Sequence, residues 1–287
     1  MDRTPRRKAE QLLKEWGINT LPISPKDIAY KQNILCQEMP SREKGVSGML
    51  LKVNDNYGIL YSTYHDNEGF ENFSIAHELG HYFLSEHPEA IFTDGDMHHS
   101  RAGYRSDDRY EIEADQFASG LLMPDFLFKS ALDRAGTGLS AIKSLANLCS
   151  SSLTATAINY ARKTTEPAAI VVTIGSKIDY CFMSDELMEY PGLSWLKKGA
   201  HIPQNTKTLE FNAEEMNVVA CREDESDCDL NTWFQSDLEV EVFEEIVGLG
   251  SYGKTLTVLT LPDPPDLGEL EEDEELEESW TPRFRRI

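Results

Sequence analysis

The sequence is poor in cations for its length, with 27 Lys and Arg against 50 Asp and Glu in 287 residues and a formal net charge of −23. Because phosphate contacts depend on Lys and Arg, we do not expect direct DNA binding, and a basic protein partner suits this charge better. No run is long and apolar enough to span a bilayer, and the opening residues lack the apolar core of a secretory signal. These absences predict a cytoplasmic protein that does not associate with a membrane.

Cysteine is also scarce: there are five residues, an odd number, and none has C-x-x-C spacing. This pattern argues against a disulfide framework and against a second zinc site, and it predicts reduced thiols. Hydrophobic residues make up 40% of the chain, which is enough to bury a core over two or three domains.

Two of the seven histidines lie in His77-Glu78-Leu79-Gly80-His81, which fits H-E-x-x-H. On a helix, positions i and i+4 share one face, so both imidazoles can bind one ion. Apolar residues at three-to-four spacing predict that helix, and Ser74 lies where an N-cap is expected. Glu78 is placed to hydrogen-bond a metal-bound water, and we interpret Gly80 as room for close backbone packing. The alternative is two surface histidines on an amphipathic helix.

A second helix is predicted over residues 111–123, ended by Pro124. Catalytic zinc takes three protein ligands and keeps a fourth position for water. Glu111 and Asp115 share a face at i, i+4, so we assign Glu111 as the third ligand and Asp115 as the carboxylate that orients a ligand imidazole. Glu113 points away from both and is the less favoured ligand. A solvated acidic helix face is the alternative.

Together, residues 73–81 (F-S-I-A-H-E-L-G-H) and 111–124 (E-x-E-A-D-x-F-A, then L-L-M-P) resemble the ImmA/IrrE family of metallopeptidases. The family pattern reads F-T-L-A-H-E-L-G-H, and this chain departs from it at Ser74 and Ile75. The match covers about residues 72–124, and a long segment with an unusual Asp94–His99 run separates the two motifs.

The resemblance implies a Zn²⁺-dependent endopeptidase with a zincin-like domain, acting in a stress or mobile-element response. Several members of the family cleave a partner repressor that carries a helix-turn-helix of the Cro/C1 type. In this chain the zinc ligands are then His77, His81 and Glu111, and Glu78 is the general base. A rival hypothesis is a regulator-binding or sensor protein that uses the metallopeptidase scaffold without proteolysis, but the intact Glu78 favours the enzyme.

The expected fold is α+β in four parts. Residues 1–125 form the zincin-like metallopeptidase domain, and residues 126–165 form a helical, helix-turn-helix-like region. Residues 166–261 form an α+β domain whose element order is compatible with a GAF-like fold that senses a small molecule. Residues 262–287 form an acidic, disordered tail. For the helical region, simple packing onto the peptidase core is favoured over a small DNA-binding or partner-binding face.

Strands in the first part are expected at 34–36, 46–53 and 57–61, the last two as a hairpin. Met49–Val53 is the candidate edge strand for a substrate backbone, although an ordinary sheet strand is the favoured interpretation. In the third part the expected strands are 170–174, 180–182, 218–220, 240–243 and 256–259. Its core should include Trp195, Trp233 and Phe234. Candidates for stabilising an oxyanion are Tyr57, Tyr61, Tyr64, His65, His98, His99 and Arg101, and the sequence does not choose among them.

Overall fold

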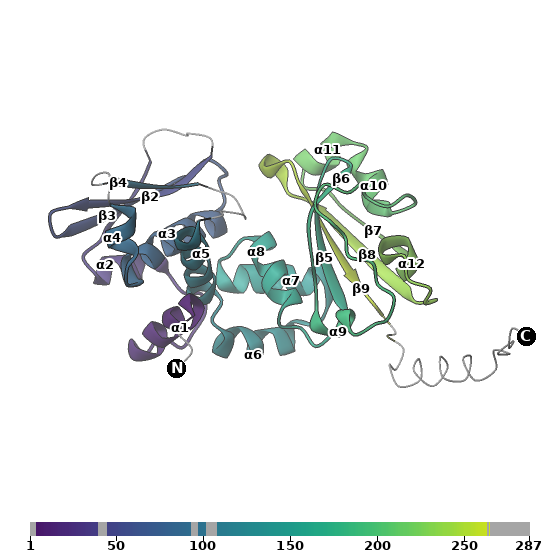
Figure 1. The fold of residues 1–287 in the computed structure, drawn as a ribbon, viewed down its shortest axis with the longest axis horizontal. Helices are drawn as coiled ribbons and strands as arrows, with labels where there is room; N and C mark the ends of the chain where they lie inside the picture. The colour runs from purple at the N-terminus through teal and green to yellow at the C-terminus, as the bar shows by residue number, and fades with distance from the viewer. Residues whose placement is uncertain (1–3, 40–44, 93–96, 102–107, 263, 265–287) are drawn as a thin grey trace, which may run out of the picture. The chain divides into compact units, whose positions relative to one another are not determined.

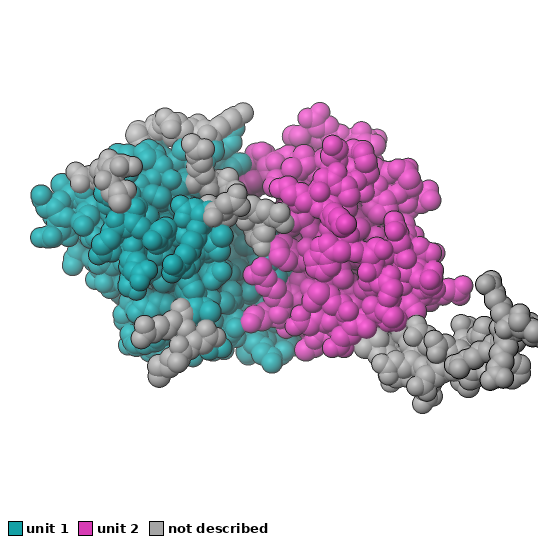
Figure 2. Space-filling model, in the orientation of Figure 1, with its two compact units in different colours: residues 1–136, 140–160 teal, residues 137–139, 161–287 magenta. Residues whose placement is uncertain are grey.

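The computed structural model describes residues 4–39, 45–92, 97–101, 108–262 and 264, without the side chain of Arg101. The chain divides into two compact units (Figure 2), and helices and sheets occur in both, which confirms the α+β class. Unit 1 comprises residues 1–136 and 140–160, and unit 2 comprises residues 137–139 and 161–287. None of the helices within the described ranges is long and apolar enough to cross a membrane.

Unit 1 contains a four-stranded sheet in the order β1-β3-β2-β4. Figure 1 labels β2, β3 and β4 of this sheet. β2 (Val46–Val53) and β3 (Asn56–Tyr61) form the expected antiparallel hairpin, and β1 (Leu35–Glu38) runs parallel to β3. β4 (Met97–Arg101) pairs with the other side of β2. β2 is therefore an interior strand, so the candidate edge-strand role of Met49–Val53 is wrong and the favoured interpretation, an ordinary sheet strand, is confirmed. Sequence reasoning missed β4 because M-H-H-S-R has neither apolar alternation nor β-branched residues.

Two helices, α3 and α5, carry the predicted metal ligands. α3 (Glu68–Phe83) begins where the Asn67 side chain accepts a hydrogen bond from Phe70 N–H, seven residues before the expected start. Ser74 is therefore not an N-cap. It lies inside the helix, where its hydroxyl donates to the carbonyl of Phe70 one turn earlier (2.9 Å), so a serine can be buried there without an unpaired hydroxyl.

α5 (Arg109–Leu122) begins at Asp108, whose carboxylate accepts from Tyr110 N–H, and it ends before Pro124 as expected. It packs closely on α3, because a Cβ built on Gly80 would lie 3.1 Å from the Cα of Ala114. Phe83 stacks on Phe117 across the same contact, with ring centroids 5.9 Å apart. The predicted role of Gly80 as room for close packing is thus confirmed, and the crossing fixes how α3 and α5 face each other.

Other helices surround this pair. They are α1 (Pro5–Glu15), α2 (Pro25–Lys31), α4 (His87–Ile91), α6 (Asp125–Ala135), α7 (Gly138–Cys149) and α8 (Leu153–Ala161). Arg6 of α1 donates to Asp125 (2.8 Å) and to Asn159 of α8 (3.1 Å). The amide of Asn72 on α3 donates to the carbonyl of Ser150 in the α7–α8 turn (3.0 Å). Helices of residues 126–160 therefore pack onto α1 and α3 within unit 1, the arrangement that the sequence favoured.

The substitution Gly69→Ala tests the contact between α3 and the α7–α8 turn. A Cβ at position 69 would lie 2.3 Å from the backbone carbon of Ser151, so one backbone segment must move. We expect the free energy of unfolding in urea to fall by about 1–3 kcal/mol. Gly58→Ala is the matched control, because its nearest neighbour is the Leu35 carbonyl at 3.7 Å. Equal stability of the two variants would contradict the tight contact.

Unit 2 contains a five-stranded antiparallel sheet in the order β6-β5-β9-β8-β7. Its strands are β5 (Ala168–Ile174), β6 (Lys177–Met183), β7 (Glu223–Asp229), β8 (Glu241–Gly248) and β9 (Thr255–Thr260). Its helices are α9 (Asp185–Met188), α10 (Lys207–Asn212), α11 (Glu215–Val219), α12 (Leu230–Phe234) and the short 3₁₀ helix η1 (Gly250–Tyr252). Trp233 and Phe234 are buried in its core as expected, whereas Trp195 is 53% exposed.

Two strand assignments in unit 2 differ from the sequence prediction. Residues 218–220 were expected to be a strand, but α11 runs through Val219 and ends there. The strand that sequence reasoning missed is β7, E-D-E-S-D-C-D, which lies at the edge of the described sheet and pairs with β8. Acidic residues are depleted in strands, so pairing with β8, and not local propensity, accounts for it. The predicted acidic tail lies almost wholly outside the described residues.

Candidate metal centre

Three predicted ligands converge where α3 crosses α5. The Nε2 atom of His77 lies 3.4 Å from Glu111 Oε2, and the Nε2 atom of His81 lies 3.3 Å from Glu111 Oε1. The two Nε2 atoms are 3.1 Å apart. One donor atom from each of the three residues lies within 4.8 Å of the other two. Two imidazole nitrogens and one carboxylate are a ligand set that zinc uses in catalytic sites.

The next residues around these donors fix their orientation. Asp115 lies one turn after Glu111 on α5, and its Oδ1 accepts from His77 Nδ1 at 2.8 Å. Because Asp115 holds the proton on Nδ1, Nε2 is the nitrogen of His77 that is left to bind a metal. Glu113 points elsewhere and contacts His87 and Arg109, so the structure does not bring it to the donors.

Glu78 shows how the site fits a metal-bound water. Its side chain is fully buried, and neither carboxylate oxygen has a hydrogen-bond partner among the described residues. Burial raises the pKa of Glu78 to about 7, although His77 acts against this shift. A buried carboxylate without a hydrogen-bond donor is costly. A water bound to a metal at His77, His81 and Glu111 would supply that donor. The ligand set and the unpaired Glu78 therefore fit the same group.

Two of the three donors, Glu111 and His81, are in charge states that suit a cation, whereas His77 must first lose a proton. Burial alone would raise the pKa of Glu111, but His77, His81 and His98 hold it well below its usual range. Burial lowers the pKa of His81 to about 4, which leaves its imidazole neutral. Burial would likewise lower the pKa of His77, but Asp115 and Glu111 raise it to about 10. Binding of a metal through His77 must therefore displace a proton.

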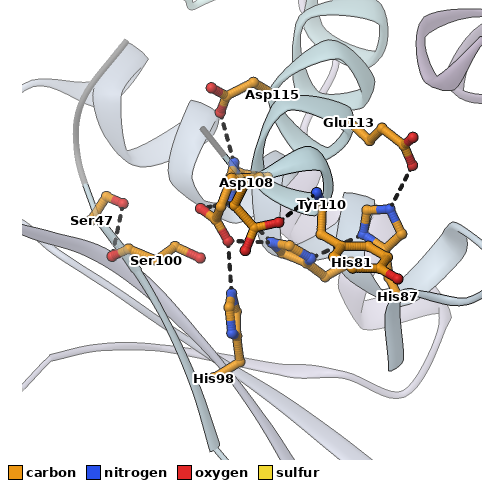
Figure 3. A network of polar contacts seen from close by, with 11 residues as sticks. Ser47, His81, His87, His98, Ser100, Asp108, Tyr110, Glu113 and Asp115 are labelled. Carbon is orange, nitrogen blue, oxygen red and sulfur yellow. Dashed lines mark hydrogen bonds and ion pairs between the residues drawn. The ribbon is translucent and has the colours of Figure 1, made fainter. Parts of the chain in front are cut away.

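Of the residues considered for oxyanion stabilisation, His98 is brought to the donors. It lies on β4 (Figure 3), and its Nε2 is 2.9 Å from Glu111 Oε1. Tyr57 packs on Tyr82 with ring centroids 5.0 Å apart, and Tyr61 lies under the ammonium of Lys26. The side chain of Arg101 lies outside the described residues.

Sequence reasoning missed His87, which lies behind His81. α3 ends at Phe83, and Glu86, with φ of 78°, turns the chain so that the buried His87 comes back to the helix. Its Nδ1 lies 3.0 Å from His81 Nδ1. H-E-x-x-H contains no information on a residue six positions after its last ligand. The signal that could have found it is a histidine in the first turn after the motif helix.

Two crossing helices that present His, His and Glu, with a buried Glu beside the first His, form a candidate metal site of the kind expected in a metallopeptidase. Residues 29–158 match the family model described as the IrrE N-terminal-like domain, Peptidase_M78, and this match supports membership of the ImmA/IrrE family. No curated protein matches the chain. A solved structure described as a Mycobacterium tuberculosis transcriptional regulator is similar, with a TM-score of 0.53 and 12% identity. The match covers 90% of this chain and 75% of that one, and at this identity it shows the fold alone.

Proposed function

We propose that this protein is a cytoplasmic zinc-dependent endopeptidase that cleaves a helix-turn-helix transcriptional repressor in a stress or mobile-element response. The observation that carries the proposal is the convergence of His77, His81 and Glu111 around a point beside the buried, unpaired Glu78. A scaffold that only binds a regulator has no need for a buried carboxylate at that position.

In this mechanism the protein residues bind the ion and move the proton. Zinc, when bound, lowers the pKa of its water toward about 7 and polarises the scissile carbonyl. Glu78 takes the proton of the attacking water and later delivers it to the leaving amine. Asp115 holds His77 in the tautomer that binds the metal through Nε2. His98 on β4, whose Nε2 lies 2.9 Å from Glu111 Oε1, is our candidate for a donor to the carbonyl oxygen.

The choice of substrate rests on charge and on the family. The net charge of −23 favours a basic partner, and DNA-binding repressors are commonly basic. The similar solved structure is described as a transcriptional regulator, which agrees with a role in regulation. The GAF-like identity and small-molecule sensing of the C-terminal part stay predictions, for which a thermal-shift screen with nucleotides and metabolites is the test.

The direct test is to incubate the zinc-loaded protein with a helix-turn-helix repressor encoded beside its gene and to identify fragments by mass spectrometry. We expect one or a few discrete cuts that disappear when zinc is chelated and return when it is added back. His77→Ala, which removes a donor, is expected to cut at a rate no higher than the chelated protein. A stable complex with an uncut repressor would favour the rival scaffold function.

A further inference from the structure

A chain of four side chains leads from the metal centre to the surface. His81 Nδ1 lies 3.0 Å from His87 Nδ1, and His87 Nε2 lies 3.1 Å from Glu113 Oε2. The other oxygen of Glu113 accepts from Arg109 Nε at 2.6 Å (Figure 3 shows His81, His87 and Glu113). Both histidines are fully buried, so the ring nitrogens have no access to bulk water. Hydrogen bonds within the chain must therefore decide where their protons lie.

The chemistry of the chain allows one proton arrangement when His81 binds a metal. An ionised carboxylate only accepts hydrogen bonds, so His87 must carry a proton on Nε2 and donate it to Glu113. A metal on His81 Nε2 requires the proton of His81 to be on Nδ1, where it has to be donated. The acceptor 3.0 Å away is His87 Nδ1, which must then be a bare lone pair. His87 is thus a neutral imidazole protonated on Nε2.

We infer that His87 is a positioning residue that holds His81 in its metal-binding tautomer, and that Glu113 and Arg109 hold His87 in turn. This inference rests on the proposed metal centre. Glu113, which is not brought to the metal donors, instead accepts the hydrogen bond of His87 Nε2. Arg109 neutralises the charge of Glu113 at the surface.

The two ligand histidines are therefore supported differently. The partner of His77 is a carboxylate, Asp115, whereas the partner of His81 is an uncharged ring. A second carboxylate in direct contact with a ligand would add another negative charge beside Glu111 and Glu78. More negative charge near the ion makes its bound water less acidic, so a neutral partner orients His81 without that effect.

The tautomers can be read directly from long-range ¹H–¹⁵N spectra of the zinc-loaded full-length protein. We expect His87 to show a protonated Nε2 and a bare Nδ1, and His81 to show a protonated Nδ1. Detection of a proton on His87 Nδ1 would overturn the inference, because His81 could not then donate to it.

Two matched pairs of variants test the effect on zinc affinity, measured by competition with a chelator. His87→Leu leaves His81 Nδ1–H without an acceptor, and we expect it to weaken zinc binding by about 10–100-fold. His87→Gln keeps an acceptor oxygen, and we expect it to bind within a few-fold of wild type. Glu113→Met and Glu113→Gln form the second pair, with the same order expected. His201→Gln, on an exposed histidine of unit 2, controls for histidine content.

The outcomes separate this inference from the proposed function. Thermal melts of the metal-free variants show whether each one folds. If His87→Leu does not fold, the zinc affinities of Glu113→Met and Glu113→Gln decide the result. If wild type retains zinc and the His87→Leu and His87→Gln variants bind it equally well, the inference alone is overturned. Wild type that retains no zinc would overturn the metal centre itself.

Discussion

Replacing Glu78 by Gln is expected to abolish cleavage of the partner while zinc stays bound. Glu78 is not one of the three donors, and Gln has nearly the same shape, so His77, His81 and Glu111 should keep their positions. An amide cannot take the proton of the attacking water. General-base catalysis contributes about 10²–10⁴-fold, and we expect the cleavage rate to fall by at least that range. Single-turnover cleavage assays and metal analysis of the same sample measure the two properties together.

Glu68→Gln is the matched control, because Glu68 carries the same side chain on the same helix but is exposed in its first turn. It should cleave at the wild-type rate. Persistent cleavage by the Glu78→Gln variant would remove Glu78 from its role as base. Loss of zinc from that variant would instead show that the buried carboxylate supports the metal site.

The parts of the site that could be predicted are those that follow from the spacing of residues along one helix or strand. His77 and His81 lie four residues apart, and the helical repeat alone puts them on one face of α3. Glu111 and Asp115 are also four residues apart, on α5. Predicting the two helices and the face that each turns to the site was therefore enough to identify the three metal donors and the partner of His77. The hairpin of β2 and β3 was likewise readable from short apolar strands around a turn.

The remainder depends on tertiary contacts that leave no local trace. β4 becomes a strand because it pairs with β2, and that pairing brings His98 to Glu111. His87 reaches His81 through the turn after α3. The start of α3 was misplaced for a different reason. A serine can cap a helix or lie inside one with its hydroxyl bonded to the previous turn, and Ser74 does the second.

β7 in unit 2 is a third kind of failure. Five of its seven residues are acidic, and such a run reads as a solvated loop when only its own residues are considered. It takes strand conformation through its register with β8, from Glu223 opposite Val247 to Asp229 opposite Glu241. At an exposed sheet edge, acidic side chains on both faces also discourage pairing with another chain. Strand propensity describes a segment in isolation, whereas the conformation of β7 is determined by its pairing with β8.

Gly48 gives the second large effect, because β2 lies directly against the general base. A Cβ built at position 48 would be 2.6 Å from Glu78 Oε1 and 3.2 Å from its Cγ. Ser47 before it lies in an irregularity of the β2–β4 register, and its hydroxyl donates to the Ser100 carbonyl at 3.3 Å. The strand is therefore held in place on both sides and has little freedom to retreat from a new methyl group.

Gly48→Ala should consequently displace the carboxylate of Glu78 and leave the metal ligands in place. Displacement of a catalytic group by about 1 Å can cost 10²-fold, so we expect cleavage to slow by about 10–100-fold with zinc affinity unchanged. Gly58→Ala, on the adjacent strand β3, should cleave normally. If Gly48 acts only through Glu78, then adding Gly48→Ala to Glu78→Gln should reduce the residual rate no further, since the two changes remove one interaction. Independent, additive losses would show that β2 contributes to catalysis by another route, such as contact with the substrate.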